Sequence, residues 1–292
     1  MSRNIPNIDW KRVDALIDLA LSEDLDDRGD VTTLSVVPEK AVVTATLLCK
    51  EPEMVLAGLD VAARVFLRLD PTLKFAPLKH DGDLCVKGEK LAEISGSARP
   101  ILTAERTALN FLQRLCGVAT MARTYAKELE DSSCVALDTR KTTPGYRNLE
   151  KYAVAVGGAS NHRIGLYDRV MIKDNHRELA ALEGDGAIRR AVERARRACP
   201  DLEIEVEADK LDEVAEAADC GVEYILLDNM SDDEMRKAVA INAGRAKLEA
   251  SGGITLPRLK SIGRIGVDFV SAGALTHSVR SMDISLDVEV TR

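Results

Sequence analysis

The spacing of apolar and polar positions changes along the chain and predicts its secondary structure. Residues 1 to about 30 show a helical pattern, with Val13 and Ile17 on one apolar stripe. Between residues 31 and 97 the apolar runs are short and are separated by turn-forming pairs such as Asp-Gly and Lys-Gly. We therefore expect a small α+β unit there, followed by a long helix capped by Thr103.

From residue 134 onward, short apolar strands alternate with amphipathic helical stretches. Six such strands end in polar residues: CVALDTRK, RVMIKDN, LEIEVEA, YILLDN, KLEASGG and FVSAGAL. Their ends recur roughly every 20 to 33 residues, the period of β/α units in a parallel barrel. The alternating tail MDISLDVEV predicts a final strand. The chain is thus expected to have an α/β fold, with a barrel of fewer than eight visible strands.

The polar strand ends are the first candidates for a functional site. Ligands bind at the carboxyl ends of barrel strands, so these side chains should form one ring. The ring contains Arg140, Lys141, Lys173, Glu205, Asp228, Ser251, Gly252, Gly253, Ala272 and Gly273. Cations, carboxylates and glycine-rich turns in one ring suit a substrate with carboxylates or phosphates, together with Mg²⁺, which prefers oxygen ligands.

Each member of this ring also has a purely structural explanation. The alternate acids of the strand at 203–207 could face solvent or a helix, and Asp228 could cap the next helix. The glycine-rich turns could simply connect strands to helices. His162 and Arg163 follow a helix closed by two glycines. We favour a functional role for this histidine because a chain with only four histidines places one of them beside an arginine, in a segment rich in Lys and Arg.

The distribution of charge supports an anionic ligand. The net charge is −8, which argues against binding to nucleic acid or to an anionic membrane. Between Thr139 and Arg177, however, there are eight Lys or Arg residues and two histidines against three acids. This basic segment indicates a cleft for a small anion, although a solvated basic face would have the same composition.

Other features of the composition predict a cytoplasmic globular protein. Of the 292 residues, 46% are hydrophobic and 30% are charged. No apolar run reaches the roughly 20 residues of a membrane span, and the N-terminus lacks the pattern of a signal peptide. The six cysteines form no CxxC pair or Cys/His cluster, so we expect reduced thiols.

Several motifs occur in a characteristic order along nearly the whole chain. They are ALSEDLDDRGDVTT (20–33), ERTALNFLQRLCGVAT (105–120), DTRKTTPGYR (138–147), GGASNHRIGLYDRVMIKDNH (157–176), IEVEAD (204–209), ILLDN (225–229), LEASGGI (248–254) and SAGALTHSV (271–279). Together they resemble the quinolinate phosphoribosyltransferase family, also called nicotinate-nucleotide pyrophosphorylase (carboxylating). Ala159 and Tyr146 depart from the common glycine and leucine of the family pattern, and neither change removes a charged contact.

The resemblance implies a domain organisation and a reaction. It implies an N-terminal α/β sandwich domain of residues 1–115, completed by the tail 276–292, and an open, about seven-stranded α/β barrel of residues 116–275. It also implies a homodimer in which Arg106 reaches the neighbouring subunit's active site. The implied enzyme transfers phosphoribosyl from phosphoribosyl pyrophosphate to the ring nitrogen of quinolinate, with loss of CO₂, and gives nicotinate mononucleotide for NAD biosynthesis.

The resemblance also assigns roles to individual residues. Cations would bind the two carboxylates of quinolinate: Arg140, His162, Arg163, Lys173 and the partner's Arg106. Glu205 and Asp228 would hold the ribose and Mg²⁺-pyrophosphate, and Lys141 would reach the substrate or the phosphoribosyl group. The 5′-phosphate would lie among Ser251, Gly252, Gly253, Gly273 and His277.

The expected chemistry needs no covalent nucleophile. The ring nitrogen would attack the anomeric carbon as pyrophosphate leaves, with positioning and electrostatic stabilisation supplying most of the catalysis. Lys141 or Lys173 would then stabilise the centre that loses CO₂, and the sequence does not choose between them. Three alternatives remain: a related enzyme for another acceptor, such as nicotinate, or a molybdenum-transport-associated homologue; an inactive or regulatory barrel; and an aldolase-type barrel with Lys173 as Schiff-base nucleophile.

Overall fold

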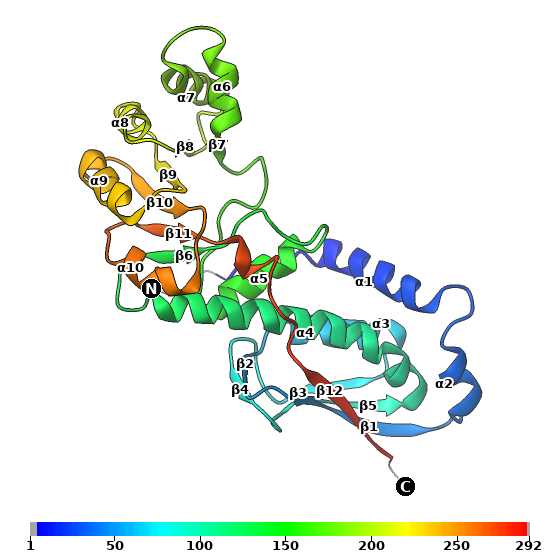
Figure 1. Ribbon diagram of the computed structural model, residues 1–292. Helices are drawn as coiled ribbons and strands as arrows, with labels where there is room; N and C mark the ends of the chain where they lie inside the picture. Colours follow the sequence, from blue (N-terminus) through cyan, green and yellow to red (C-terminus); the bar gives the residue numbers. More distant parts are fainter. Residues whose placement is uncertain (1–4, 291–292) are drawn as a thin grey trace. The chain divides into compact units, whose positions relative to one another are not determined.

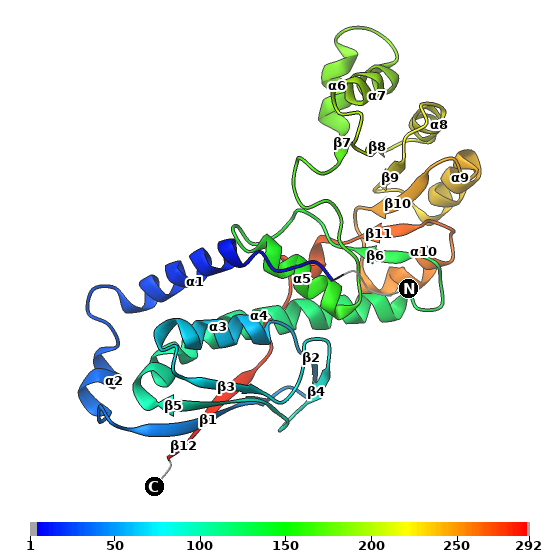
Figure 2. The ribbon, with the colours of Figure 1, turned by 180° about the vertical axis from the view of Figure 1, so that it is seen from behind.

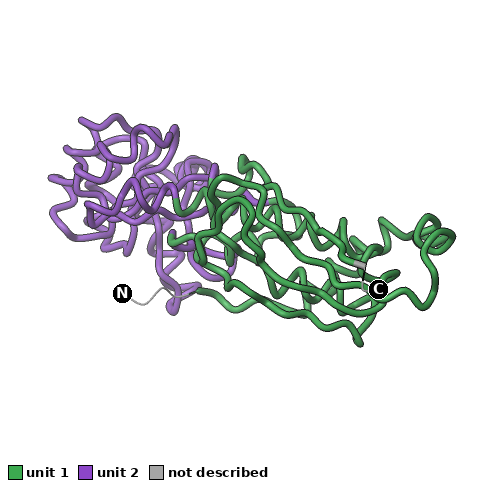
Figure 3. Tube along the Cα trace, turned by 90° about the horizontal axis from the view of Figure 1, so that it is seen from below, with its two compact units in different colours: residues 1–123, 143–158, 275–292 green, residues 124–142, 159–274 purple. Residues whose placement is uncertain are grey.

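The chain folds into two compact units, which are coloured separately in Figure 3. The computed structural model describes residues 5–290, so the first four residues of the predicted N-terminal helix lie outside it. Unit 1 comprises residues 1–123, 143–158 and 275–292, and unit 2 comprises residues 124–142 and 159–274. Within the described residues, no helix is both long enough and apolar enough to cross a bilayer.

Unit 1 contains a four-stranded antiparallel sheet. Its strands are β1 (Val42–Cys49), β3 (Lys74–Pro77), β5 (Lys90–Ser97) and β12 (Ile284–Val290), in the order β12-β1-β5-β3. The short strands β2 (Glu53–Val55) and β4 (Leu84–Val86) pair separately. The alternating tail forms β12, which pairs with β1 from Val43↔Val290 to Cys49↔Ile284 and lies beside it in Figures 1 and 2.

Helices cover one side of this sheet. The helices of unit 1 are α1 (Trp10–Leu25), α2 (Val31–Val36), α3 (Leu59–Leu69), most of α4 (Ala98–Glu128) and α5 (Arg147–Gly157). Both views show α3 and α4 running along the same side of the sheet. Phe66, Ile94 and Leu112 are fully buried in this unit, and each such side chain stabilises the fold by about 1.5–3 kcal/mol.

The long helix starts earlier than the sequence predicted. Helix α4 begins at Ala98, so Thr103 is not its N-cap and instead donates its hydroxyl to Asp30 Oδ2 at 3.1 Å. Pro100 lies in the first turn of the helix, where a proline is tolerated. Arg106 consequently lies more than two turns inside α4, away from the N-terminus of the helix.

Unit 2 contains a six-stranded parallel sheet that curves into an open barrel. Each predicted strand is present: β6 (Val135–Leu137), β7 (Val170–Ile172), β8 (Ile204–Ala208), β9 (Tyr224–Asp228), β10 (Lys247–Ser251) and β11 (Phe269–Ser271). They have the order β6-β11-β10-β9-β8-β7. A single parallel bridge, Leu137↔Ser160, takes the place of a seventh strand, and the barrel is not closed within residues 5–290. The predicted α/β fold class, with its incomplete barrel, is therefore confirmed.

The helices of unit 2 lie outside the curved sheet (Figure 1). They are α6 (Asp174–Ala181), α7 (Ala187–Ala198), α8 (Leu211–Asp219), α9 (Asp232–Asn242) and α10 (Leu259–Gly263), with short 3₁₀ turns at Leu256–Arg258 and Gly273–Leu275. Because strands and helices alternate, the carboxyl ends of all six strands point to one edge of the barrel. The polar residues that follow the strands are thereby brought to that edge.

Candidate active site

A pocket of about 500 Å³ lies at the carboxyl ends of the barrel strands. Its lining consists of Thr139, Arg140, Lys141, His162, Arg163, Met171, Lys173, Asp174, Glu207, Leu226, Asp228, Glu249, Ser251 and Ser271. Seven of these are residues predicted from the sequence: Arg140, Lys141, His162, Arg163, Lys173, Asp228 and Ser251. Side chains from all six strands, or from the segments directly after them, therefore share one cavity.

The cations of the pocket come from segments at the first strands of the barrel. Arg140 and Lys141 follow β6 in a tight turn, in which the Lys141 N–H donates to Thr139 Oγ1 at 3.0 Å. Arg163 is buried and donates to the Arg169 carbonyl at 3.0 Å. Burial and the nearby Arg140 lower the pKa of Arg163, although a guanidinium remains charged at neutral pH. Crowded cations of this kind are stabilised by an anionic ligand.

Carboxylates lie on the neighbouring strands. Lys173 Nζ donates to Glu207 Oε2 at 2.7 Å, and the lysine side chain remains 45% exposed. Asp228 ends β9 and accepts from the amide of Asn229 at 2.6 Å. Burial raises the pKa of Asp228, and the negative charges of Glu207 and Asp209 raise it further. The pocket thus contains a repulsive pair of acids next to a lysine that can contact solvent or substrate.

Glu205 does not lie where the sequence predicted. Strand β8 continues to Ala208, so Glu205 is its second residue rather than its end. Its side chain is fully buried and is not among the residues that line the pocket. Glu207 faces the same side two residues later, because side chains alternate along a strand, and it is this acid that reaches the pocket. The prediction chose the right strand and face but the wrong position.

Glu205 instead contacts His162 in the interior of the barrel. The distances from His162 Nε2 are 3.1 Å to Glu205 Oε2 and 3.5 Å to Glu249 Oε2. Burial lowers the pKa of His162, but the hydrogen bond with Glu205 and the charges of both acids outweigh burial and raise it. Burial and Glu205 raise the pKa of Glu249 to about 7. The interior below the pocket is therefore ionic, whereas barrel interiors are usually filled with aliphatic side chains.

The predicted glycine-rich turns are present but are not part of the pocket lining. Gly252 and Gly253 follow β10 with φ values of +79° and +58°, and a Cβ at Gly252 would collide with Asn229. Ala272 and Gly273 directly follow β11, whose last residue Ser271 does line the pocket. The two predicted residues Arg106 and His277 belong to unit 1: Arg106 is exposed on α4, and His277 Nδ1 lies 2.6 Å from Ser278 Oγ.

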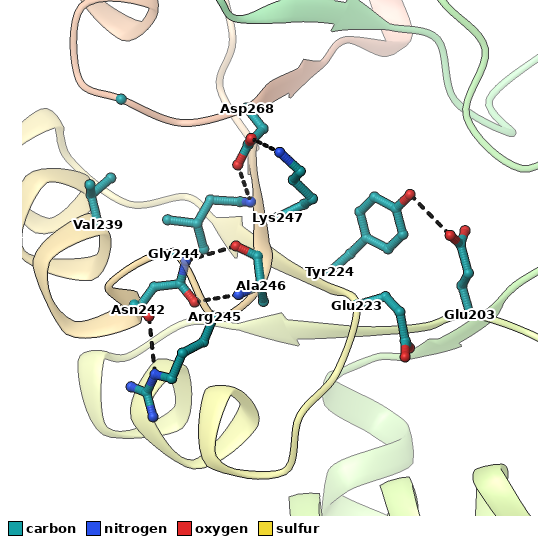
Figure 4. Close-up of a pocket in the computed structure, with 12 residues that line it drawn as sticks. Glu203, Glu223, Tyr224, Val239, Asn242, Gly244, Arg245, Ala246, Lys247 and Asp268 are labelled. Carbon is teal, nitrogen blue, oxygen red and sulfur yellow. Dashed lines mark hydrogen bonds and ion pairs between the residues drawn. The ribbon is translucent and has the colours of Figure 1, made fainter.

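A second cavity, of about 510 Å³, lies at the amino ends of the strands (Figure 4). Several of its polar side chains pair with one another: Lys247 Nζ donates to Asp268 Oδ1 at 2.7 Å, and the Tyr224 hydroxyl donates to Glu203 Oε1 at 3.4 Å. The Asn242 side chain bonds the backbone of Ala246. The pocket at the carboxyl ends instead gathers seven of the residues predicted from the sequence, and ligands of barrels bind at that end, so it is the candidate active site.

Five pocket residues with polar side chains were not predicted as site residues: Thr139, Asp174, Glu207, Glu249 and Ser271. Glu249 lies two residues before Ser251, the last residue of β10, and so faces the same side of the sheet. Ser271 is itself the last residue of β11. The alternation of side chains along the strands could therefore have predicted both residues. Asp174 follows Lys173 in the predicted KDNH motif. The missing information was the length of each strand, which decides which member of an alternating row reaches the cavity.

An open α/β barrel with cations and carboxylates at its mouth defines a class of enzymes that act on anionic small molecules. Two family descriptions match the chain: "Quinolinate phosphoribosyl transferase, N-terminal domain" at residues 30–116 and "Quinolinate phosphoribosyl transferase, C-terminal domain" at residues 118–287. The chain belongs to the quinolinate phosphoribosyltransferase family, as its motifs predicted.

Named relatives and solved structures agree with this family. The chain is 43% identical to the probable nicotinate-nucleotide pyrophosphorylase [carboxylating] of Bacillus subtilis, over 90% of this chain and 89% of that protein. It is 42% identical to the chloroplastic protein of that name from Oryza sativa, over 97% of this chain and 79% of that protein. The crystal structure of NadC from Streptococcus pyogenes superposes with a TM-score of 0.91 at 39% identity, covering 98% of this chain and all of that one.

Proposed function

We propose that this enzyme transfers the phosphoribosyl group of phosphoribosyl pyrophosphate to the ring nitrogen of quinolinate. The adjacent carboxylate then leaves as CO₂, a proton takes its place on the ring carbon, and the products are nicotinate mononucleotide and pyrophosphate. The observation that carries this proposal is the division of the pocket: Arg140, Lys141, Arg163 and Lys173 supply positive charge, and Glu207 and Asp228 lie on the next strands. A pyridine dicarboxylate suits the cations, and the ribose and pyrophosphate end suits the acids.

The cations of the pocket serve both binding and chemistry. Arg140 and Arg163 can bind carboxylates with two parallel hydrogen bonds each, which fixes the plane of the pyridine ring. Holding the ring nitrogen close to the anomeric carbon converts a bimolecular reaction into a positioned one. Either Lys141 or Lys173 then lies in the same cavity as the centre that loses CO₂ and stabilises its electron pair.

The acids of the pocket suit a magnesium ion. Asp228 and Glu207 offer carboxylate oxygens, which Mg²⁺ prefers. Burial raises the pKa of Asp228, and the negative charge of Glu207 raises it further. A divalent cation would relieve that repulsion, so these two acids fit the metal, whereas buried Glu205 does not reach the pocket. When bound, Mg²⁺ would neutralise the pyrophosphate leaving group. The two acids also favour the positive charge that develops on the ribosyl group.

We further propose a homodimer in which Arg106 completes the partner's active site. The family resemblance suggests this assembly, and two features of unit 1 support it. Arg106 is exposed on α4, so it is accessible to another chain. Three of the six residues of α2 are exposed apolar side chains, namely Val31, Leu34 and Val36, whose coverage by a second chain would be favourable. The predicted cytoplasmic location remains a prediction.

The decisive assay supplies quinolinate, phosphoribosyl pyrophosphate and Mg²⁺ and follows nicotinate mononucleotide and ¹⁴CO₂ from carboxyl-labelled quinolinate. We expect product and CO₂ in equal amounts, and neither product when nicotinate replaces quinolinate. Pyrophosphate release with nicotinate but not with quinolinate would overturn the choice of acceptor. Absence of product with any pyridine carboxylate would favour a regulatory barrel, and borohydride trapping of Lys173 with substrate would favour an aldolase.

A further inference from the structure

Glu249 lines the active-site pocket, yet the proposed reaction gives it no task. Its side chain is 1% exposed, and its carboxylate lies in the interior of the barrel rather than at a strand end. An acid facing a pocket for anionic substrates is unfavourable unless a cationic or hydrogen-bond-donating group of the protein compensates it. Its role must therefore be sought among its protein neighbours.

Two buried acids converge on one nitrogen of His162. Glu205 on β8 and Glu249 on β10 lie 3.1 and 3.5 Å from His162 Nε2. The other ring nitrogen, Nδ1, accepts the backbone N–H of Arg163 at 2.6 Å. The ring thus has a hydrogen bond from the main chain at Nδ1 and close contacts with the two acids at Nε2. A ring held in this way has a defined orientation toward the pocket that it lines.

The main chain at His162 is fixed by a third buried acid. Asp138, immediately after β6, is fully buried and accepts the His162 N–H at 2.8 Å with one oxygen. Its other oxygen accepts the side-chain amide of Asn161 at 2.6 Å. Strand bridging at Ser160 anchors the same segment to β6. Because the backbone is already held, the acids at Nε2 control only the direction of the ring.

A metal ion is the other possible occupant of this cluster, since oxygen or nitrogen atoms of His162, Glu205 and Glu249 all lie within 4.8 Å of one another. The cluster, however, has a cation of its own. Arg169 Nη1 lies 3.6 Å from Glu205 Oε2, and its guanidinium stacks on the Tyr224 ring at 3.9 Å. Arg169 and His162 together compensate the acids, so the cluster needs no metal ion.

We propose that Glu249 is a positioning residue, which acts with Glu205 to hold the His162 ring in the orientation that faces the anionic substrate. The proposal rests on the proposed function, because it assumes that His162 contacts a carboxylate of quinolinate. Releasing one of the two acids should let the ring rotate and weaken that contact. The effect should appear in the KM for quinolinate rather than in the KM for phosphoribosyl pyrophosphate.

The kinetic test uses Glu249→Gln, His162→Ala and the double variant, with Glu203→Gln as the matched control. Glu203 directly precedes β8 and, like Glu205, contacts Arg169, at 3.2 Å, but it lines the other cavity. We expect Glu249→Gln to raise the KM for quinolinate about tenfold, equivalent to about 1.4 kcal/mol, and to have no further effect when His162 is already alanine. The proposal would be overturned if the two substitutions raised the KM for quinolinate by independent factors that multiply in the double variant. It would also be overturned if Glu249→Gln and Glu203→Gln raised that KM equally.

A second readout needs no catalysis. The ¹⁵N resonances of the imidazole rings can be recorded without substrate, and His162→Ala assigns those of His162 among the four histidines. Glu249→Gln should shift the His162 Nε2 resonance, and Glu203→Gln should not. An unchanged resonance in Glu249→Gln contradicts the inference. Elemental analysis that finds one metal ion per chain in the wild type and none in Glu249→Gln also contradicts it. A wild-type enzyme that makes no nicotinate mononucleotide contradicts only the proposed function, because the resonance still reports the positioning.

Discussion

Glu205 and Glu207 are two residues apart on one strand, and burial gives them different tasks. Glu205 is fully enclosed and contacts His162, whereas Glu207 reaches the pocket and contacts Lys173. The acid within the barrel interior orients a side chain, and the acid at the mouth is available to substrate and metal. The two side chains are chemically identical, so their different roles follow from their different depths in the barrel.

This difference predicts distinct responses to magnesium. Glu207→Gln should raise the Mg²⁺ concentration needed for half-maximal activity by about tenfold, because one anionic oxygen ligand is lost. Glu205→Gln should leave that concentration within about twofold and act mainly on the KM for quinolinate. Titrating Mg²⁺ in the standard assay distinguishes the two; a shift with Glu205→Gln alone would restore the role predicted from the sequence.

Lys173 should be essential for turnover but not for folding. Its side chain is 45% exposed, and its ion pair with Glu207 stabilises the fold by no more than about 1 kcal/mol. Lys173→Ala should lower kcat/KM by at least about a hundredfold with an unchanged melting temperature. Lys247→Ala is the control, because Lys247 makes an equally short ion pair with Asp268 at the opposite strand ends. Loss of activity in Lys247→Ala to the same extent would remove the assignment.

The buried Glu249 also predicts how stability depends on pH. Burial and Glu205 raise its pKa from 4.5 to about 7, so between these values the folded protein binds more protons than the unfolded chain. Stability from this group is therefore complete below about pH 4.5 and is lost as the pH rises through 7. Glu249→Gln should gain stability relative to wild type between pH 5 and pH 8. Urea unfolding of both proteins at pH 5 and pH 8 measures this difference in the free energy of unfolding. A larger advantage of Glu249→Gln at pH 5 than at pH 8 would contradict the prediction.

At the scale of the element, close approach of two helices depends on a glycine. Gly157 ends α5 against α4, and a Cβ there would lie 2.7 Å from Ala122 Cβ and still closer to the Ala119 carbonyl oxygen. Alanine at this position would normally favour a helix by up to about 1 kcal/mol. The collision with backbone cannot be relieved by a rotamer change, so the contact should outweigh that preference.

Gly157→Ala should therefore destabilise unit 1 by about 1–3 kcal/mol in chemical denaturation. Adding Ala122→Gly should not restore stability, because the nearest atom is the backbone oxygen of Ala119. Stability equal to or above wild type in the single variant would show that the helices can separate without cost.

The elements themselves were predictable where periodicity was strong. All six barrel strands and helix α5 with its closing glycine were predicted from alternation, apolar runs and glycine, because these patterns reflect local backbone preferences and burial. The start of α4 was not, since a proline is compatible both with a helix end and with a first turn. Strand length was not predicted either, and that single uncertainty misplaced Glu205.

At the scale of the whole molecule, the proposed dimer can be tested by sharing of the active site. Arg106→Ala and Lys173→Ala should each be inactive alone. If Arg106 acts in the neighbouring pocket, a mixed dimer contains one intact site, so isolated mixed dimers should have about half of wild-type activity and an equal unfractionated mixture about a quarter. Activity is measured after the two variants have been unfolded and refolded together, with mixed dimers isolated by two affinity tags. No recovery in verified mixed dimers would place Arg106 in its own subunit's site or outside any site.

The sequence by itself determined the family, the order of strands and helices along the chain, and the residue types needed to bind a dicarboxylate and a pyrophosphate. These follow from local periodicity and from motifs, which are properties of neighbouring positions. Only the tertiary structure decided which side chains share a cavity: it placed Glu207 at the mouth, and Glu205 with Glu249 around His162. The depth of a side chain in a barrel depends on strand length and on the register between strands, and both are set by packing across the sheet.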